Sequence, residues 1–149
     1  NDGCANNGLE YNHPNTVTFQ NGYLRITAEK LSQPLFCNTT NKYYNYRSGV
    51  VWSKFTHKYG YFEISAKLPV GYKGYWPAFW LWAADGCVFY NEIDIMELMG
   101  CDSESGVVFD NVYHWLDNTC GRGYQAQKLL NLPSLSNEHK YAVEWAPKR

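Results

Sequence analysis

The sequence contains no apolar run long enough to span a membrane as a helix, which takes about 18 residues. It also has no excess of either charge: lysine and arginine number 13, aspartate and glutamate 14, and the formal net charge is −1. A membrane-spanning helix is therefore not expected. Proteins that bind nucleic acid or anionic membranes carry a basic surface that this balance does not suggest, so we expect neither as a partner.

Closely spaced cysteine pairs are also missing. The five cysteines form no Cys-x-x-Cys pair, so neither a zinc site nor a dithiol redox motif is expected. Disulfides stay open in any connectivity, because spacing alone does not fix the pairing, and the odd number leaves at least one thiol without a partner inside this chain. The cysteines are Cys4, Cys37, Cys87, Cys101 and Cys120.

Aromatic residues, in contrast, are plentiful. They make up 17% of the chain and include 6 tryptophans and 13 tyrosines, more than core packing usually requires at this length. Flat rings with a polar edge suit the faces of sugar rings. The composition therefore favours a protein that contacts sugars.

Helical periodicity is nearly absent, and the only helix candidate covers residues 125–132. Elsewhere apolar and polar residues alternate with a period of two, which is typical of half-buried strands. Short strands at regular spacing predict an all-β protein, an antiparallel β-sandwich formed as one domain over residues 1–149. The expected strands cover residues 16–20, 23–29, 49–53, 60–68, 76–82, 90–99, 107–116 and 139–146.

Two local features refine this prediction. Asn21-Gly22 between two alternating runs predicts a hairpin with a two-residue turn, and Leu24, Ile26 and Ala28 are expected to face inward. Residues 30–46 are rich in Asn, Thr, Tyr and Pro without periodicity, so an irregular connection is expected there.

Three carboxylates, Glu92, Asp94 and Glu97, stand in an otherwise apolar strand. Burying charge among apolar side chains costs free energy, so their presence requires an explanation. Strict alternation places Glu92 and Asp94 on one face and Glu97 on the other. A β-bulge near Ile95 and Met96 would return Glu97 to the face of Glu92, and bulges are frequent beside active sites.

Two facing carboxylates are what glycoside hydrolysis requires. In retaining enzymes they stand about 5 to 5.5 Å apart, close to the span of nearby positions on one strand face. The spacing of Glu92 and Glu97 therefore favours a retaining hydrolase. A solvated or salt-bridged strand face is the alternative, and the apolar, tryptophan-rich neighbours argue against it.

The segment Glu92-Ile-Asp-Ile-Met-Glu97 resembles the Glu-x-Asp-x-x-Glu signature of glycoside hydrolase family 16, in its laminarinase-like form with a bulge. Residues 58–69, 74–81 and 141–147 are similar to segments that flank this signature in the family. Residues 6–11 resemble its N-terminal stretch that contacts glycan. The resemblance therefore covers nearly the whole chain.

This resemblance implies a concanavalin-like jelly roll that binds glycan across its concave sheet and cleaves internal β-linkages with retained configuration. Carried over by position, Glu92 is the nucleophile and Glu97 the general acid and base, while Asp94 is their electrostatic and hydrogen-bonding partner. No cofactor is required for this chemistry. A structural Ca²⁺ is frequent in the family, and the sequence does not identify oxygen ligands for it.

Candidates for substrate binding come from the same comparison and from strand alternation. Trp76 and Trp80 share one strand face and are expected to stack on sugar rings, with core packing as the alternative. His114 and Trp115 match a His-Trp pair of many relatives, which implies that His114 reaches the cleft near the general acid; a structural histidine is the alternative. Asn7 is expected to bind glycan hydroxyls.

The sequence departs from the family pattern at positions that bear on the substrate. Phe89-Tyr90-Asn91 stands where relatives often carry Trp-Pro and Gly, and Val50 where many laminarinases carry Arg. We expect β-1,3-glucan or mixed β-1,3/1,4-glucan as the substrate, with agar- or carrageenan-type galactans as the alternative. A non-catalytic β-glucan-binding protein is a further alternative, which the presence of all three carboxylates disfavours.

Some expectations concern the whole protein. We expect a secreted, periplasmic or cell-surface protein that binds polysaccharide and is a monomer when complete. The sequence ends at Arg149, soon after a Glu-Trp-Ala-Pro segment, whereas family members continue with further strands of both sheets. The chain is therefore expected to be the N-terminal part of a catalytic domain, with exposed sheet edges where the missing strands would pair.

Overall fold

The structure is a computed structural model. The chain divides into two compact units, Asn1–Phe55 and Thr56–Arg149. A single catalytic domain over the whole chain stays a prediction. The described residues are 3–4, 8–70, 73–82, 92–98, 107–114, 124–131 and 134–147.

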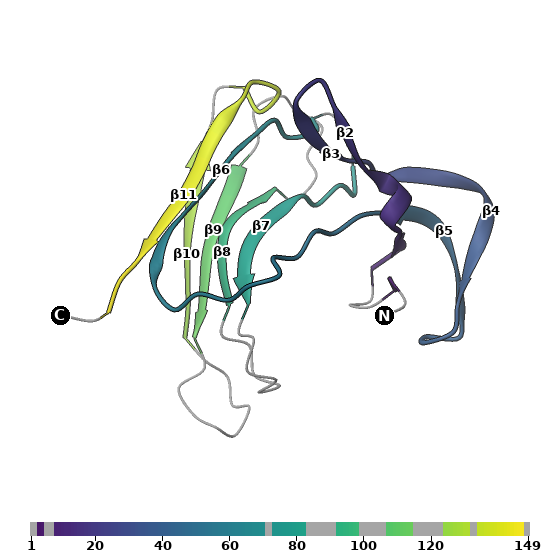
Figure 1. Ribbon diagram of the computed structural model, residues 1–149, viewed down its shortest axis with the longest axis horizontal. Coiled ribbons are helices and arrows are strands. Elements are labelled where there is room, and N and C mark those ends of the chain that lie inside the picture. The colour runs from purple at the N-terminus through teal and green to yellow at the C-terminus, as the bar shows by residue number, and fades with distance from the viewer. Residues whose placement is uncertain are drawn as a thin grey trace. The chain divides into compact units, whose positions relative to one another are not determined.

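The larger sheet of the first unit has the strand order β1-β5-β4. Its strands β4 and β5 are labelled in Figure 1. The long strands β4 (Glu29–Cys37) and β5 (Lys42–Ser48) form an antiparallel hairpin, and the short β1 (Glu10–Asn12) runs parallel to β5. A single 3-10 turn, η1 (Pro14–Thr16), follows β1 and leads into a separate hairpin.

That second hairpin, β2 (Val17–Gln20) with β3 (Tyr23–Ile26), confirms the turn predicted from Asn21-Gly22. Gln20 pairs with Tyr23, so two residues close the turn, and their φ angles are 52° and 81°. Positive φ at both central positions is what a type I′ turn requires, and Asn-Gly adopts it at little cost.

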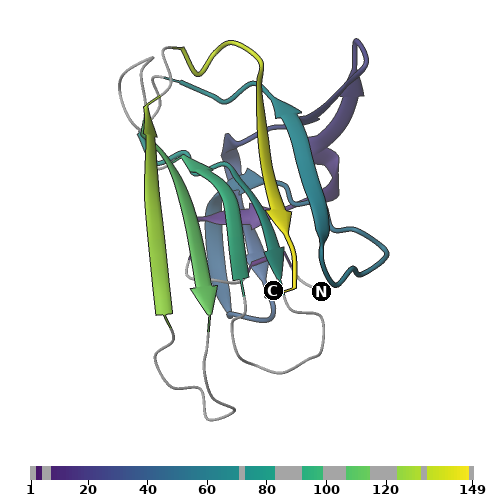
Figure 2. The same cartoon turned by 90° about the vertical axis from the view of Figure 1, so that its left-hand side faces the viewer.

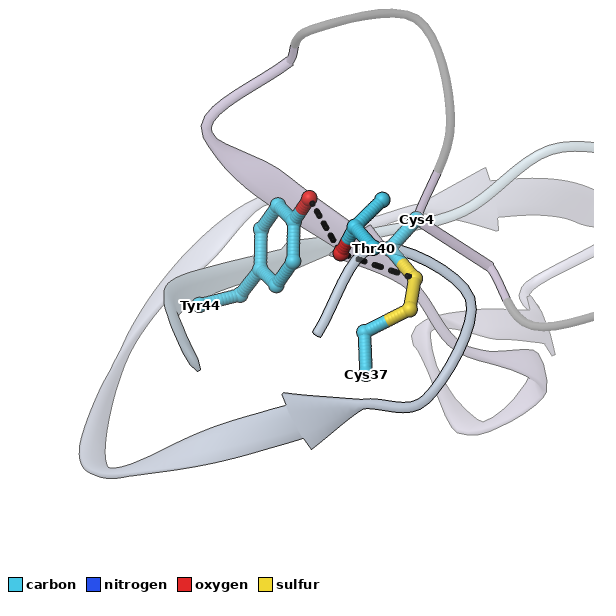
Figure 3. The surroundings of a disulfide bond; sticks show 4 residues. All are labelled: Cys4, Cys37, Thr40 and Tyr44. Carbon is cyan, nitrogen blue, oxygen red and sulfur yellow. Dashed lines mark hydrogen bonds between the residues drawn. A yellow bond between two sulfur atoms is a disulfide. The ribbon is translucent and has the colours of Figure 1, made fainter. Parts of the chain in front are cut away.

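A disulfide between Cys4 and Cys37 ties the N-terminal segment to the end of β4 (Figure 3). Both cysteines are buried against Tyr44 of β5, whose hydroxyl lies 3.1 Å from the hydroxyl of Thr40. Cross-links of this kind restrict the unfolded chain and stabilise a fold by about 2–4 kcal/mol. The sequence had left the pairing open, and the structure assigns this one.

The second unit contains a four-stranded and a two-stranded sheet, both antiparallel (Figure 2). The larger sheet has the order β10-β9-β8-β7, and β11 pairs with β6 in the smaller one. The strands are β6 (Gly60–Ala66), β7 (Ala78–Trp82), β8 (Glu92–Leu98), β9 (Val107–His114), β10 (Tyr124–Asn131) and β11 (His139–Trp145).

The two sheets of the second unit pack face to face, as predicted for a β-sandwich. Ile95, Met96 and Leu98 of β8 are buried in one cluster with Tyr141 of β11, and Phe62 of β6 packs against it. Burying an aliphatic or aromatic side chain of this size is worth about 1.5–3 kcal/mol. This core fixes which face of β8 is left for a site.

Two predictions for the first unit are wrong. The irregular connection expected at residues 30–46 is the β4–β5 hairpin, whose register shifts between Lys30 and Leu35 and so hides the alternation in the sequence. Leu24 and Ile26 are 47% and 48% exposed, because no core cluster of the described residues covers the two-stranded sheet that carries them.

Two further predicted elements are also wrong. Residues 125–132 were the only helix candidate, yet residues 124–131 form β10. Pairing with β9 along the whole strand outweighs this weak propensity. Residues 49–53 form no strand, although Val50, Val51 and Trp52 suggested one.

Candidate active site

Strand β8 contains one residue more than the segments of β7 and β9 that pair with it, which confirms the predicted bulge. On the β7 side, Met96 and Asp94 pair with consecutive residues, so Ile95 has no partner. On the β9 side, the three steps from Asp94 to Glu97 match two steps of the partner strand. Both Ile95 and Met96 are buried in the core, so the bulge places two successive side chains on the inner face.

The bulge gathers the three carboxylates on one face of the sheet. Directly paired residues of neighbouring strands project to the same side, and alternate residues of a strand share a face. The carboxylates therefore share the face of β7 that carries Trp80 and Trp82, whereas Phe79 and Leu81 pack against the core. The pairs are Glu92 with Trp82, Asp94 with Trp80 and Glu97 with Ala78.

This face combines buried acids with exposed aromatic rings. Asp94 is 2% and Glu97 9% exposed, whereas Trp82 is 42% and Trp76 60% exposed. The rings of Trp80 and Trp82 are neighbours, with centroids 5.1 Å apart and planes inclined by 57°. Accessible rings beside desolvated carboxylates suit the apolar faces and hydroxyls of a sugar chain.

Trp76 contacts the candidate general acid directly. Its indole Nε1 donates a hydrogen bond of 2.8 Å to Oε1 of Glu97. Trp76 lies two residues before Ala78, the partner of Glu97, and the amide of Leu98 donates to the carbonyl oxygen of Pro77 at 3.0 Å. Backbone pairing therefore reaches the residue next to Trp76 and holds its side chain diagonally beside the acid. Sequence analysis missed this contact, which joins residues 21 positions apart.

The electrostatic environment of Glu92 favours its protonated form. Burial is the main cause that raises the pKa of Glu92, and the negative charge of Glu97 raises it further. A hydrogen bond with Asp94 acts in the opposite direction, and the net pKa is raised above the usual range. A negative charge that disfavours ionisation of a neighbouring carboxyl group is expected where two acids share a catalytic site.

Replacing Glu92 by glutamine is expected to stabilise the fold at neutral pH. Because the pKa of Glu92 is higher in the folded than in the unfolded protein, its ionised form opposes folding above both pKa values. A rise of a few degrees in Tm at pH 7 should therefore shrink to nothing as the pH falls below about 4.3, the unfolded value. Thermal unfolding of both proteins across this pH range measures the effect. A glutamine variant less stable than the parent at pH 7 would contradict it.

The remaining predicted substrate-binding residues are not placed in the site. Asn7 and Trp115 lie outside the described residues. His114 is the last residue of β9, and its side chain lies outside what the structure describes. Tyr113, not His114, pairs with Glu92. The roles of these three residues stay predictions.

The described part of the chain offers neither a cluster of metal ligands nor a helix that could span a membrane. No group of three His, Cys, Asp or Glu side chains there could hold a metal ion, and a structural Ca²⁺ stays an expectation of the family resemblance. Within the same residues, no helix is both long and apolar enough to cross a membrane.

Three acids on the tryptophan-bearing face of an antiparallel sandwich form the arrangement found in glycoside hydrolases, which act with a pair of carboxyl groups. The sequence comparison narrows this class to one family. The profile of glycosyl hydrolases family 16 matches residues 7–149, and the chain belongs to this family.

Individual relatives agree with this assignment. Endo-1,3-1,4-beta-glycanase ExsH of Rhizobium meliloti (strain 1021) is 35% identical over 133 residues, covering 88% of this chain and 27% of the relative. Glucan endo-1,3-beta-glucosidase A1 of Niallia circulans is 32% identical over 161 residues, covering 96% of this chain and 22% of the relative. The chain thus spans about a quarter of the length of the relatives it matches.

Solved structures confirm the predicted fold class. The laminarinase catalytic domain of Thermotoga maritima MSB8 superposes with a TM-score of 0.71 at 29% sequence identity. The match covers 95% of this chain and 57% of that domain. The all-β jelly roll predicted from the sequence is therefore the fold of this chain.

Proposed function

We propose that this chain carries the catalytic strand of a retaining, endo-acting β-glucan hydrolase that cleaves internal β-1,3 linkages. One observation carries the proposal: the bulge in β8 brings Glu92, Asp94 and Glu97 onto the open face that bears Trp80 and Trp82. The names of the relatives, an endo-1,3-1,4-beta-glycanase and a glucan endo-1,3-beta-glucosidase, support a β-glucan as the substrate.

The proposed reaction is a double displacement. A carboxylate oxygen of Glu92 forms a bond to the anomeric carbon while the glycosidic C–O bond breaks, and the proton of Glu97 passes to the leaving oxygen. Glu97, now ionised, takes a proton from water, whose oxygen attacks the anomeric carbon and releases Glu92. Two inversions give net retention.

Asp94 has a supporting place in this scheme. It is almost fully buried between the two glutamates along β8 and hydrogen-bonds to Glu92, which favours the ionised nucleophile. Burial and the charge of Glu97 act against that ionisation. The hydrogen bond with Asp94 therefore partly offsets the two effects that raise the pKa of Glu92.

The substrate assignment is tested by reducing-end release from laminarin, lichenan and agarose, with purified protein that contains this chain in full. We expect activity on laminarin, activity on lichenan where a β-1,3 bond is accessible, and none on agarose. Glu97→Gln provides the matched inactive control. Activity on agarose alone would replace the glucan by a galactan, and binding to laminarin without hydrolysis would favour a non-catalytic β-glucan-binding protein.

Export of the protein is part of this proposal. A polysaccharide too large to enter cells has to be met outside the cytoplasm. The buried Cys4–Cys37 disulfide supports the same compartment, since disulfides persist in the oxidising environments of secreted and periplasmic proteins.

A further inference from the structure

Trp76 occupies two environments at once. Its side chain is 60% exposed, yet its indole N–H points at Glu97, a residue only 9% exposed, and donates to it at 2.8 Å. The backbone of the following residue, Pro77, is held by the amide of Leu98, next to Glu97 in the chain. The ring and the backbone beside it are thus bonded to two successive residues of β8, Glu97 and Leu98.

The hydrogen bond from the Trp76 indole makes the two carboxyl oxygens of Glu97 different from each other. An indole N–H donates only and neither accepts nor loses a proton in water, whereas a carboxyl oxygen accepts in both protonation states. Trp76 therefore occupies Oε1 of Glu97 before and after proton transfer. The proton that Glu97 gives and takes is left to Oε2, the oxygen that Trp76 does not contact in this bond.

We propose that Trp76 is a positioning residue for proton transfer: its N–H fixes the carboxyl plane of Glu97 so that Oε2 faces the glycosidic oxygen. This inference rests on the proposed function of Glu97 as general acid and base. It is distinct from stacking of the ring on a sugar, because it depends on one hydrogen and not on the ring face.

Trp76→Phe separates the two roles, since phenylalanine keeps a flat ring and removes the N–H. On laminarin, whose leaving group needs a proton, we expect kcat to fall about 10- to 100-fold with KM unchanged, the rate equivalent of a hydrogen bond to a charged group. On 2,4-dinitrophenyl β-laminaribioside, whose leaving group departs without a proton, formation of the glycosyl-enzyme should change less than about 3-fold, well short of that range.

Trp145→Phe is the matched control. Trp145 lies on β11, where its ring packs on Tyr59, and losing its indole should leave both rates unchanged. A rise in KM at constant kcat for Trp76→Phe would show a stacking role alone, and equal losses on both substrates would show a structural one. Either result overturns the proposal.

The variant Glu97→Gln tests the premise that Glu97 is the general acid and base. It should lose activity on laminarin and keep formation of the glycosyl-enzyme from the dinitrophenyl substrate. If Glu97→Gln affects both substrates equally, the assigned role of Glu97 fails. If it discriminates between them and Trp76→Phe does not, only the positioning role fails.

Discussion

Removing the Glu92 carboxylate by Glu92→Ala is expected to abolish glucan hydrolysis, because no glycosyl-enzyme can form. The alanine leaves space for a small anion on the side of the sugar from which Glu92 would attack. Added azide should therefore restore cleavage of 2,4-dinitrophenyl β-laminaribioside and give a glycosyl azide of inverted, α configuration. Proton NMR of the product reads the configuration directly.

Glu97→Ala should behave in the complementary way. Turnover of laminarin should fall by about 10²–10⁴, the usual contribution of general acid–base catalysis. With the dinitrophenyl substrate the glycosyl-enzyme still forms on Glu92, and azide attacks it to give the β product. The two variants thus differ in the configuration of one product, so each carboxylate is assigned independently.

The opposite pattern of azide products would exchange the two roles. A β azide from Glu92→Ala would make that residue the acid and base, and an α azide from Glu97→Ala would make that residue the nucleophile. Asp94→Asn is the control for a general loss of charge in the cluster, since it removes one negative charge and leaves both glutamates in place. It should yield no azide product with either configuration.

The sequence predicted a structural feature correctly where residues close together in the chain determine it. Asn-Gly fixes a two-residue turn by its tolerance of positive φ, and the β2–β3 hairpin forms as predicted. The odd spacing of acids in β8 was equally informative. Only a bulge lets Glu92 and Glu97, five positions apart on one strand, share a face, and the register contains that bulge.

The sequence patterns predicted the wrong secondary structure where pairing between strands determines the conformation. Residues 124–131 carry helix-favouring side chains, and the ladder with β9 determines their conformation. The β4–β5 hairpin is hidden for a different reason. Its register slips between Lys30 and Leu35, so no single alternation runs through it, and the Cys4–Cys37 bridge that closes its end joins residues 33 positions apart.

The candidate site shows the same limit. Its three acids are recognisable because buried charge in an apolar strand needs an explanation. The hydrogen bond from Trp76 to Glu97 cannot be recognised in the sequence, because it depends on how the start of β7 lies beside the bulge of β8. A tryptophan that sequence analysis assigned to sugar stacking is placed by register against the acid.

Because of the bulge, deleting one residue of β8 and deleting two are expected to have very different effects on hydrolysis. Deleting Met96 removes the bulge and restores strict alternation, which leaves Glu97 on the face of Glu92. Deleting Ile95 and Met96 together turns Glu97 toward the core instead. We therefore expect measurable hydrolysis of laminarin after the single deletion and none after the double deletion.

The cost in stability has to be separated from this effect. Ile95 and Met96 are both buried, so any deletion also removes core packing, at about 2–5 kcal/mol for a side chain of this size. Met96→Ala removes nearly the same side chain and keeps the bulge. It should lose stability with activity close to that of the parent, measured by chemical unfolding and reducing-end release.

The stability of the double-deletion variant tests which way the Glu97 side chain points. If it turns the Glu97 carboxylate into the core, the buried charge costs several kcal/mol, and adding Glu97→Leu should make the protein more stable. In the parent chain the same substitution removes the acid from the site face and should end hydrolysis without that gain. A double deletion that stays active, or a single deletion that behaves as its equal, would mean that strand parity does not set the direction of the acid.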